Sequence, residues 1–275
     1  MEMRAYAVER ASALLQVLEA QVQRAAQAGG PNTIHDLRVA IRRFSQCLRV
    51  FAPQFPVRRA KRIRRRLRRV IALAGEVRSR DIAVKLWKRA GQPADAACVA
   101  KIEHDRKQAC EKLRKRLGRW RDRDFARKWE KVWTRPHTGE ATARPDLAAL
   151  LANYMEAAAD LLDGQPSAKA LHKFRLATKR VRYTLELFRP CCGPGLEQRI
   201  QALRRNQQYL GEINDYATTR GLIPGKKAAA FTQFLETRAS ARTADLLGYL
   251  RRQLLAPERR RWWIGYLRRI EELRN

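Results

Sequence analysis

The chain has 275 residues, and 45% of them are hydrophobic, so it is long enough to form one large folded domain or two of ordinary size. This composition excludes a disordered basic tail. Its 59 Lys and Arg residues against 27 acidic ones give a formal net charge of +32, which opposes compaction unless a polyanionic partner relieves the repulsion. Nucleic acid, an anionic membrane surface and a phosphate polymer are the candidate partners.

The first twenty residues alternate charged and apolar side chains without a continuous apolar core, so we expect no signal peptide. No apolar run approaches the roughly 20 residues that a membrane span needs, which argues against membrane insertion. The five cysteines show no C-x-x-C and no metal-type spacing, which favours reduced thiols over a disulfide framework. We therefore expect a cytoplasmic protein with no cofactor and no metal site.

The first half of the sequence predicts a series of helices separated by glycine and proline. The predicted helices cover residues 5–27, 32–53, 57–74, 77–90 and 94–133. Asn32 or Thr33 offers an N-cap for the second of them. Gly75 ends the third helix, and Gly118 interrupts the last one.

The second half repeats this order after a linker. Further helices are predicted at residues 147–162, 171–188 and 196–210, the last ending at Gly211. The stretch TRPHTGEATARPD, residues 134–146, lies between the two series of predicted helices. It predicts a first half at residues 1–135, a linker at 136–144 and a second half at 145–275. No segment shows sustained alternation with a period of two, so the predicted fold class is all-α.

The same histidine-led helix occurs twice, as IHDLRVAIRRFSQCLRVF at residues 34–51 and LHKFRLATKRVRYTLELF at residues 171–188. Identical residues pair His35 with His172, Arg38 with Arg175, Ala40 with Ala177, Arg43 with Arg180, Leu48 with Leu185 and Phe51 with Phe188. A repeat separated by almost half the chain indicates a doubled, pseudo-symmetric protein. We therefore expect two helical bundles, related by about half a turn and packed around a central basic groove or channel that both histidines face.

Each copy carries an apolar stripe and, beside it, a basic stripe at the same three-and-four spacing. The basic stripes comprise His35, Arg38, Arg42 and Arg49 in the first copy and His172, Arg175, Lys179 and Arg182 in the second. Arg43 and Arg180 point away from them. Solvated flanks with alkyl stems lying over the core are the simpler interpretation. However, a helix stabilised for its own sake pairs Glu with Lys or Arg at i,i+4, whereas these stripes accumulate repulsion, which fits a surface that binds anions.

The helix that follows the first copy is the most basic part of the chain. Its segment RRAKRIRRRLRR, Arg58–Arg69, contains nine basic residues in twelve and no acid. One line of cations along it comprises Arg59, Arg62, Arg66 and Arg69, and another comprises Arg58, Lys61, Arg65 and Arg68. Arginine suits bidentate contacts to phosphate. The matching helix of the second half keeps only Arg199, Arg204 and Arg205, so the predicted phosphate surface lies mainly in the first half.

The sequence contains none of the common catalytic motifs for phosphate loops, zinc proteases, serine hydrolases or dinucleotide binding. This argues against an enzyme, including an enzyme that acts on phosphate compounds. Proteins that bind single-stranded nucleic acid add aromatic stacking platforms to a basic groove, and Arg58–Arg69 contains no aromatic residue. Trp262, Trp263 and Tyr266 near the end of the chain keep a nucleic-acid-binding protein open as the alternative function.

Two His-x-x-Arg helices, each followed by a basic helix and an AGE or LGE turn, resemble the CHAD domain, the conserved-histidine α-helical domain. The resemblance implies a stand-alone, non-catalytic protein that binds inorganic polyphosphate and associates with polyphosphate granules. The residues that match the family's ligand positions are His35, Arg38, Arg42, Arg43, His172, Arg175, Lys179 and Arg180. The basic stripes and helices add these residues to the predicted ligand set: Arg49, Arg59, Arg62, Arg66, Arg69, Arg182 and Arg205. In the turn GEVRSRD, Arg78 and Asp81 fit the family pattern, but Ser79 stands where an Asp is usual.

Overall fold

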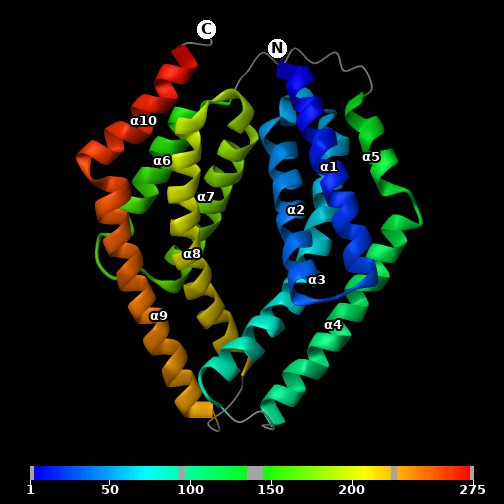
Figure 1. Ribbon diagram of the computed structural model, residues 1–275, viewed down its shortest axis with the longest axis vertical. Coiled ribbons are helices and arrows are strands. Elements are labelled where there is room, and N and C mark those ends of the chain that lie inside the picture. Colours follow the sequence, from blue (N-terminus) through cyan, green and yellow to red (C-terminus); the bar gives the residue numbers. More distant parts are fainter. Residues whose placement is uncertain (1–2, 93–96, 135–144, 224–227, 273–275) are drawn as a thin grey trace. The chain divides into compact units, whose positions relative to one another are not determined.

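The computed structural model describes residues 3–92, 97–134, 145–223 and 228–272 (Figure 1). All regular elements in these ranges are helical, which confirms the all-α prediction. The helices are α1 Met3–Gln27, α2 Pro31–Val50, α3 Val57–Arg89, α4 Ala97–Arg121, α5 Phe125–Thr134, α6 Leu147–Ala159, α7 Ala168–Leu187, α8 Pro194–Leu222, α9 Ala229–Leu250 and α10 Pro257–Glu272. Short turns of 3-10 helix, η1 Ala52–Gln54 and η2 Arg189–Cys191, follow α2 and α7, and a π-helical turn, η4 Arg251–Leu255, precedes α10.

The chain divides into two compact units, residues 1–144 and 145–275. Each unit begins with the same order of elements: a helix, a histidine helix, a 3-10 turn, a long helix and a further helix. The predicted linker at residues 136–144 falls outside the described residues, and the half-turn relation between the units stays a prediction. No helix in the described part of the chain is long and apolar enough to cross a membrane.

The first unit is a four-helix bundle. Helices α1 to α4 pack in chain order, α1 also contacts α4, and α5 packs against α1 and α3 (Figure 1). The apolar stripe predicted on α2 forms part of its core: Ile34, Leu37, Ile41, Phe44 and Leu48 are all buried. Burial of this stripe leaves the neighbouring basic stripe at the edge of the helix interface, where it remains open to solvent.

The second unit packs α6, α7, α8 and α9 in chain order, and α10 returns to contact α6. A buried polar link joins the first three of these helices. The Tyr154 hydroxyl lies 3.0 Å from Thr178 Oγ1, and the Asn206 side-chain amide donates to it. Burial raises the pKa of Tyr154, so the hydroxyl keeps its proton. Because the Tyr154 hydroxyl contacts side chains of both α7 and α8, the link favours one register of these three helices against one another.

The structure corrects the helix boundaries predicted at two glycines. Helix α3 runs through Gly75 and helix α8 runs through Gly211, so neither glycine ends a helix. Glycine in a helix interior costs only about 1 kcal/mol relative to alanine, which the packing of a long helix offsets.

Two further boundaries also differ from the prediction. Gly30 occupies the N-cap of α2 with Pro31 at the first helical position, so neither Asn32 nor Thr33 is the cap. The break predicted at Gly118 falls instead at residues 122–124, between α4 and α5. There Asp124 adopts a φ of 47°, a left-handed conformation that Asp tolerates better than most residues.

Candidate functional site

Cations from two helices converge on His35 in the first unit. Arg38 and Arg42 lie on α2 with it, and Arg78 comes from α3. The ring remains exposed, yet its pKa is lowered from 6.5, first by the desolvation that the surrounding atoms cause, then by Arg78, Arg42 and Arg38, against the opposing effect of Asp36. The neighbouring cations thus disfavour protonation of His35 in the free protein. Arg78 is a cation that the helical pattern of α2 could not place beside His35, because folding brings it there from α3.

Arg38 reaches from α2 to the backbone of α3. Its Nη1 donates to the Ile71 carbonyl oxygen at 3.1 Å. The same nitrogen lies only 2.9 Å from the position that a Cβ on Gly75 would occupy. A side chain at position 75 would therefore require the end of the Arg38 side chain to shift.

The face of α3 on which Arg38 docks carries further arginines. Arg64 and Arg78 each lie seven residues from Ile71, so all three share one side of the helix. Arg64 is half-buried, and desolvation followed by repulsion from Arg68 lowers its pKa. A surface depression of about 500 Å³ along the first part of α3 is lined by Arg58, Lys61, Arg62, Arg64, Arg65 and Arg68. We call one set of residues the histidine face: His35, Arg38, Arg42, Arg64, Arg68 and Arg78.

In the second unit, His172 and Arg175 line a cavity of about 650 Å³ between α7, α8 and α9. Most of the other residues that line it are apolar or neutral, among them Leu210, Ile213 and Leu247. No atom lies within 4 Å of where a Cβ on Gly211 would stand, so the close approach seen at Gly75 has no counterpart. The two histidines thus occupy matching places in the repeat but differ in their surroundings.

A family model described as the CHAD domain matches residues 9–224, which is most of the chain. The chain belongs to the CHAD family. Two solved structures share its fold. The CHAD domain from the plant Ricinus communis is 20% identical, with a TM-score of 0.62 over 97% of this chain and 92% of that one. PptA from Streptomyces chartreusis is 15% identical, with a TM-score of 0.61 over 96% and 99%. Comparison with curated proteins gives no significant match.

Acids in or just after the two Gly-Glu segments, which lie inside α3 and α8, tie neighbouring helices together. Asp81 on α3 pairs with Arg106 on α4 at 2.6 Å, and Glu212 on α8 pairs with Arg242 on α9 at 2.5 Å. Ser79, which replaces the usual acid, donates its hydroxyl to the Gly75 carbonyl oxygen at 2.9 Å. These contacts give the residues of the two segments a structural role, while Arg78 contributes to the histidine face.

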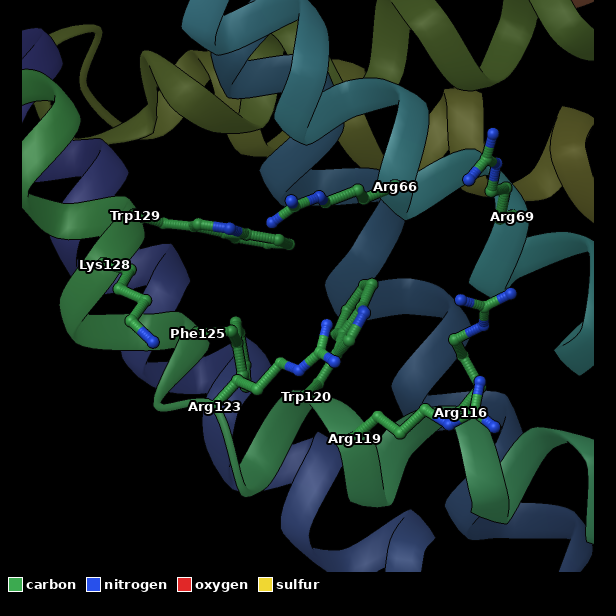
Figure 2. A pocket seen from close by; sticks show the side chains of 9 residues that line it. All are labelled: Arg66, Arg69, Arg116, Arg119, Trp120, Arg123, Phe125, Lys128 and Trp129. Carbon is green, nitrogen blue, oxygen red and sulfur yellow. The ribbon is translucent and has the colours of Figure 1, made fainter.

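The predicted line of arginines on α3 lies away from Ile71, and three of its members line two separate hollows. Arg62 contributes to the basic depression, and Arg59 is exposed nearby. At 100° per residue, Arg66 and Arg69 point about 140–160° away from Ile71 and hence from the histidine face. They line a separate cavity with α4 and α5 (Figure 2). The structure therefore does not bring Arg66 and Arg69 to the predicted histidine surface.

Two cations predicted to face the ligand are buried in the second unit. Arg182 is 6% exposed, pairs with Glu186 one turn along α7 and donates to Gln207 Oε1 at 2.8 Å. Lys179 is 8% exposed. The prediction that these two lie on an open basic stripe is wrong, because α8 and Glu186 enclose Arg182 and packing covers Lys179.

The remaining predicted ligands are at least partly open to solvent. Arg180, Arg205 and Arg49 are exposed, and Arg43 is half-buried. The Arg205 guanidinium lies 5.4 Å from the centre of the Tyr209 ring, a contact that leaves its hydrogen-bond donors available. For these four residues, contact with phosphate stays a prediction.

Proposed function

We propose that this CHAD chain binds inorganic polyphosphate, held mainly by the histidine face of the first unit. The observation that carries the proposal is the convergence of Arg38, Arg42 and Arg78 on His35, whose pKa their charges help to lower. Like charges gathered from two helices destabilise the free protein, and an anion bound among them removes that repulsion. Membership of the CHAD family and the net charge of +32 support the same ligand class.

The chemistry of the face suits a chain of phosphates. Guanidinium groups form bidentate, charge-assisted hydrogen bonds to phosphate oxygens, and the basic depression on α3 extends the row of donors. Polyphosphate offers dense negative charge without bases, so electrostatic contacts suffice to hold it. The proposal is of binding without catalysis, by a cytoplasmic protein that associates with polyphosphate granules.

The aromatic residues near the basic surfaces do not favour the nucleic-acid alternative. Trp263 is 1% exposed, and the Arg199 guanidinium covers the Trp262 ring at 3.7 Å and the Tyr266 ring at 4.0 Å. Proteins that bind single strands leave ring faces open for bases to stack on. These rings are occupied by contacts within the second unit.

A competition assay tests the proposal. Labelled long-chain polyphosphate is displaced by single-stranded DNA, double-stranded DNA or RNA at matched phosphate and salt concentrations. We expect polyphosphate to be preferred, and Arg42→Gln with Arg78→Gln to weaken its binding by about tenfold or more, since two charged contacts are lost. The matched control is Arg127→Gln with Lys131→Gln, two exposed positions on α5, which should change affinity less than about twofold. Preference for nucleic acid would overturn the proposal.

A further inference from the structure

A second basic cavity, of about 440 Å³, lies on the flank of α3 that faces away from the histidine face (Figure 2). Three helices of the first unit build it. Its lining comprises Arg66 and Arg69 from α3, Arg116, Arg119 and Trp120 from α4, Arg123 from the following turn, and Phe125, Lys128 and Trp129 from α5. Residues separated by up to half the length of the first unit therefore meet around one small volume.

The charge of this cavity is entirely positive. Six of its nine lining residues are cations and none is acidic. Arg116 is half-buried, and the other five cations are exposed. Among the described residues, none of the six forms a salt bridge with an acid, in contrast to Arg106 and Arg121 on the same helix α4. Six like charges around one cavity repel one another, so an anion bound there lowers the free energy of the site.

The floor of the cavity is aromatic and rigid. Trp120, Phe125 and Trp129 are 9%, 6% and 3% exposed, and their ring centres lie 5.0 to 5.3 Å apart. Trp129 also stacks on Phe44 of the core at 6.1 Å. Rings so deeply buried and packed on one another leave little open face on which a base could stack. They instead form an apolar boundary, beside which charge interactions are stronger than in open water.

We infer that this cavity binds a compact oligophosphate group, a run of about three phosphates, through bidentate contacts from its arginines. Its volume lies at the low end of the range of about 300–1,000 Å³ for small-molecule sites, which fits a triphosphate better than the middle of a long polymer. The group has two sources, the end of a polyphosphate chain or a nucleoside triphosphate. The site does not depend on the histidine face, because Arg66 and Arg69 point to the other side of α3.

Calorimetric titration of the full chain with tripolyphosphate, ATP and adenosine tests the inference. The test variant carries Arg119→Gln, Arg123→Gln and Lys128→Gln, three exposed positions that the proposed polyphosphate surface does not include. The matched control carries Lys85→Gln, Lys88→Gln and Arg89→Gln, which remove the same charge at exposed positions near the end of α3. Thermal unfolding of each variant checks that the fold is kept. Tryptophan emission provides a second readout, since Trp120 and Trp129 line the cavity.

We expect the cavity to bind tripolyphosphate saturably, with affinity reduced at least about tenfold in the test variant and little changed in the control, because three charged contacts are lost. Arg42→Gln with Arg78→Gln should leave this binding within about twofold. ATP binding close to that of tripolyphosphate identifies nucleotides as a source, and much weaker ATP binding identifies chain ends. Equal losses in test and control variants overturn the inference, as does the absence of saturable binding. Loss only in the Arg42→Gln, Arg78→Gln variant also overturns it, while leaving the proposed function intact.

Discussion

The two histidine helices share a scaffold but not a charge pattern. In the first unit, Arg38, Arg42 and Arg78 gather around His35 with a single neighbouring acid, Asp36. In the second unit, acids stand where the first unit has cations. With His35 aligned on His172, Glu186 takes the place of Arg49, and with Gly75 aligned on Gly211, Glu197 takes the place of Lys61.

These acids turn potential ligands of the second unit into structural residues. Glu186 pairs with Arg182 and lies 3.7 Å from Arg204, while Glu197 pairs with Arg189 and lies 3.6 Å from Arg204. The contrast teaches that a repeated motif preserves packing more strictly than surface charge. A basic residue in such a repeat predicts anion binding only where no acid lies one turn away or across the adjacent helix.

The largest effect should come from removing an acid of the second unit. Glu186→Leu leaves Arg182 without its partner in a site where the two side chains are only 11% and 7% exposed. Loss of one member of a buried pair typically costs about 3–5 kcal/mol. Glu197→Gln, at a side chain that is 36% exposed, should cost less than about 1 kcal/mol. Chemical denaturation measures both, and equal losses would contradict the distinction between buried and surface pairs.

The second-largest expected effect compares how much each unit contributes to the affinity for long-chain polyphosphate. The test variant carries Arg42→Gln, Arg64→Gln, Arg68→Gln and Arg78→Gln in the histidine face. The control variant carries the same change at four exposed arginines of the second unit: Arg180, Arg205, Arg260 and Arg261.

We expect about a hundredfold loss in the test variant, and a salt dependence that falls by about 0.7 for each lost phosphate contact. The control should lose less than about tenfold, because its cations are scattered rather than convergent. Titrations over a range of salt concentrations measure both quantities. Equal losses would mean that net charge, and not the histidine face, determines binding.

Sequence patterns predicted what one helix can specify by itself. The apolar stripe of α2, from Ile34 to Leu48, and the exposure of His35 follow from three-and-four spacing, and the structure confirms them. The seven-residue spacing that places Arg64 and Arg78 beside Ile71 was also readable in the sequence and could have identified them. The burial of Arg182 was partly visible, since Glu186 stands four residues later.

Contacts between helices could not be predicted in this way. The helical wheel separated Arg66 from the apolar stripe but did not say that Arg119, Arg123 and Lys128 would meet it across a cavity. The approach of Arg38 from α2 to Gly75 is likewise a contact between helices, which local sequence rules do not include. The neighbour that a side chain meets is decided by packing over long sequence distances.

The glycines at positions 75 and 211, inside α3 and α8, allow a smaller, direct comparison of the units. Gly211→Ala places a methyl group in open space inside a helix, so we expect a gain of about 0.5–1 kcal/mol in stability. Gly75→Ala has the same helix preference but displaces Arg38 from the Ile71 carbonyl, so its net effect should be near zero or unfavourable. Thermal unfolding distinguishes them. Similar gains at both glycines would show that the Arg38 contact contributes nothing to stability.

The smallest effect concerns the protonation of the two histidines. In the free protein the pKa of His35 lies below 6.5, because desolvation and then Arg78, with Arg42 and Arg38, disfavour the cation. Phosphate oxygens bound beside the ring favour the cation and raise this pKa. Between the free and bound pKa values, binding takes up a proton, so affinity should rise as pH falls from about 8 towards 6 and level off below the free value.

The variant His35→Gln keeps hydrogen-bonding capacity but removes this titration. We expect it to bind polyphosphate at pH 8 within about threefold of the parent, since arginines supply most of the attraction, and to lose most of the gain at pH 6. His172→Gln is the matched variant in the second unit, where Arg175 is the one cation among the described residues that line the cavity with His172. Calorimetry in buffers of different ionisation enthalpy counts the protons taken up. If the pH profile of polyphosphate binding is unchanged in His35→Gln, His35 has a structural role. The converging arginines would then form the binding site without a contribution from the histidine.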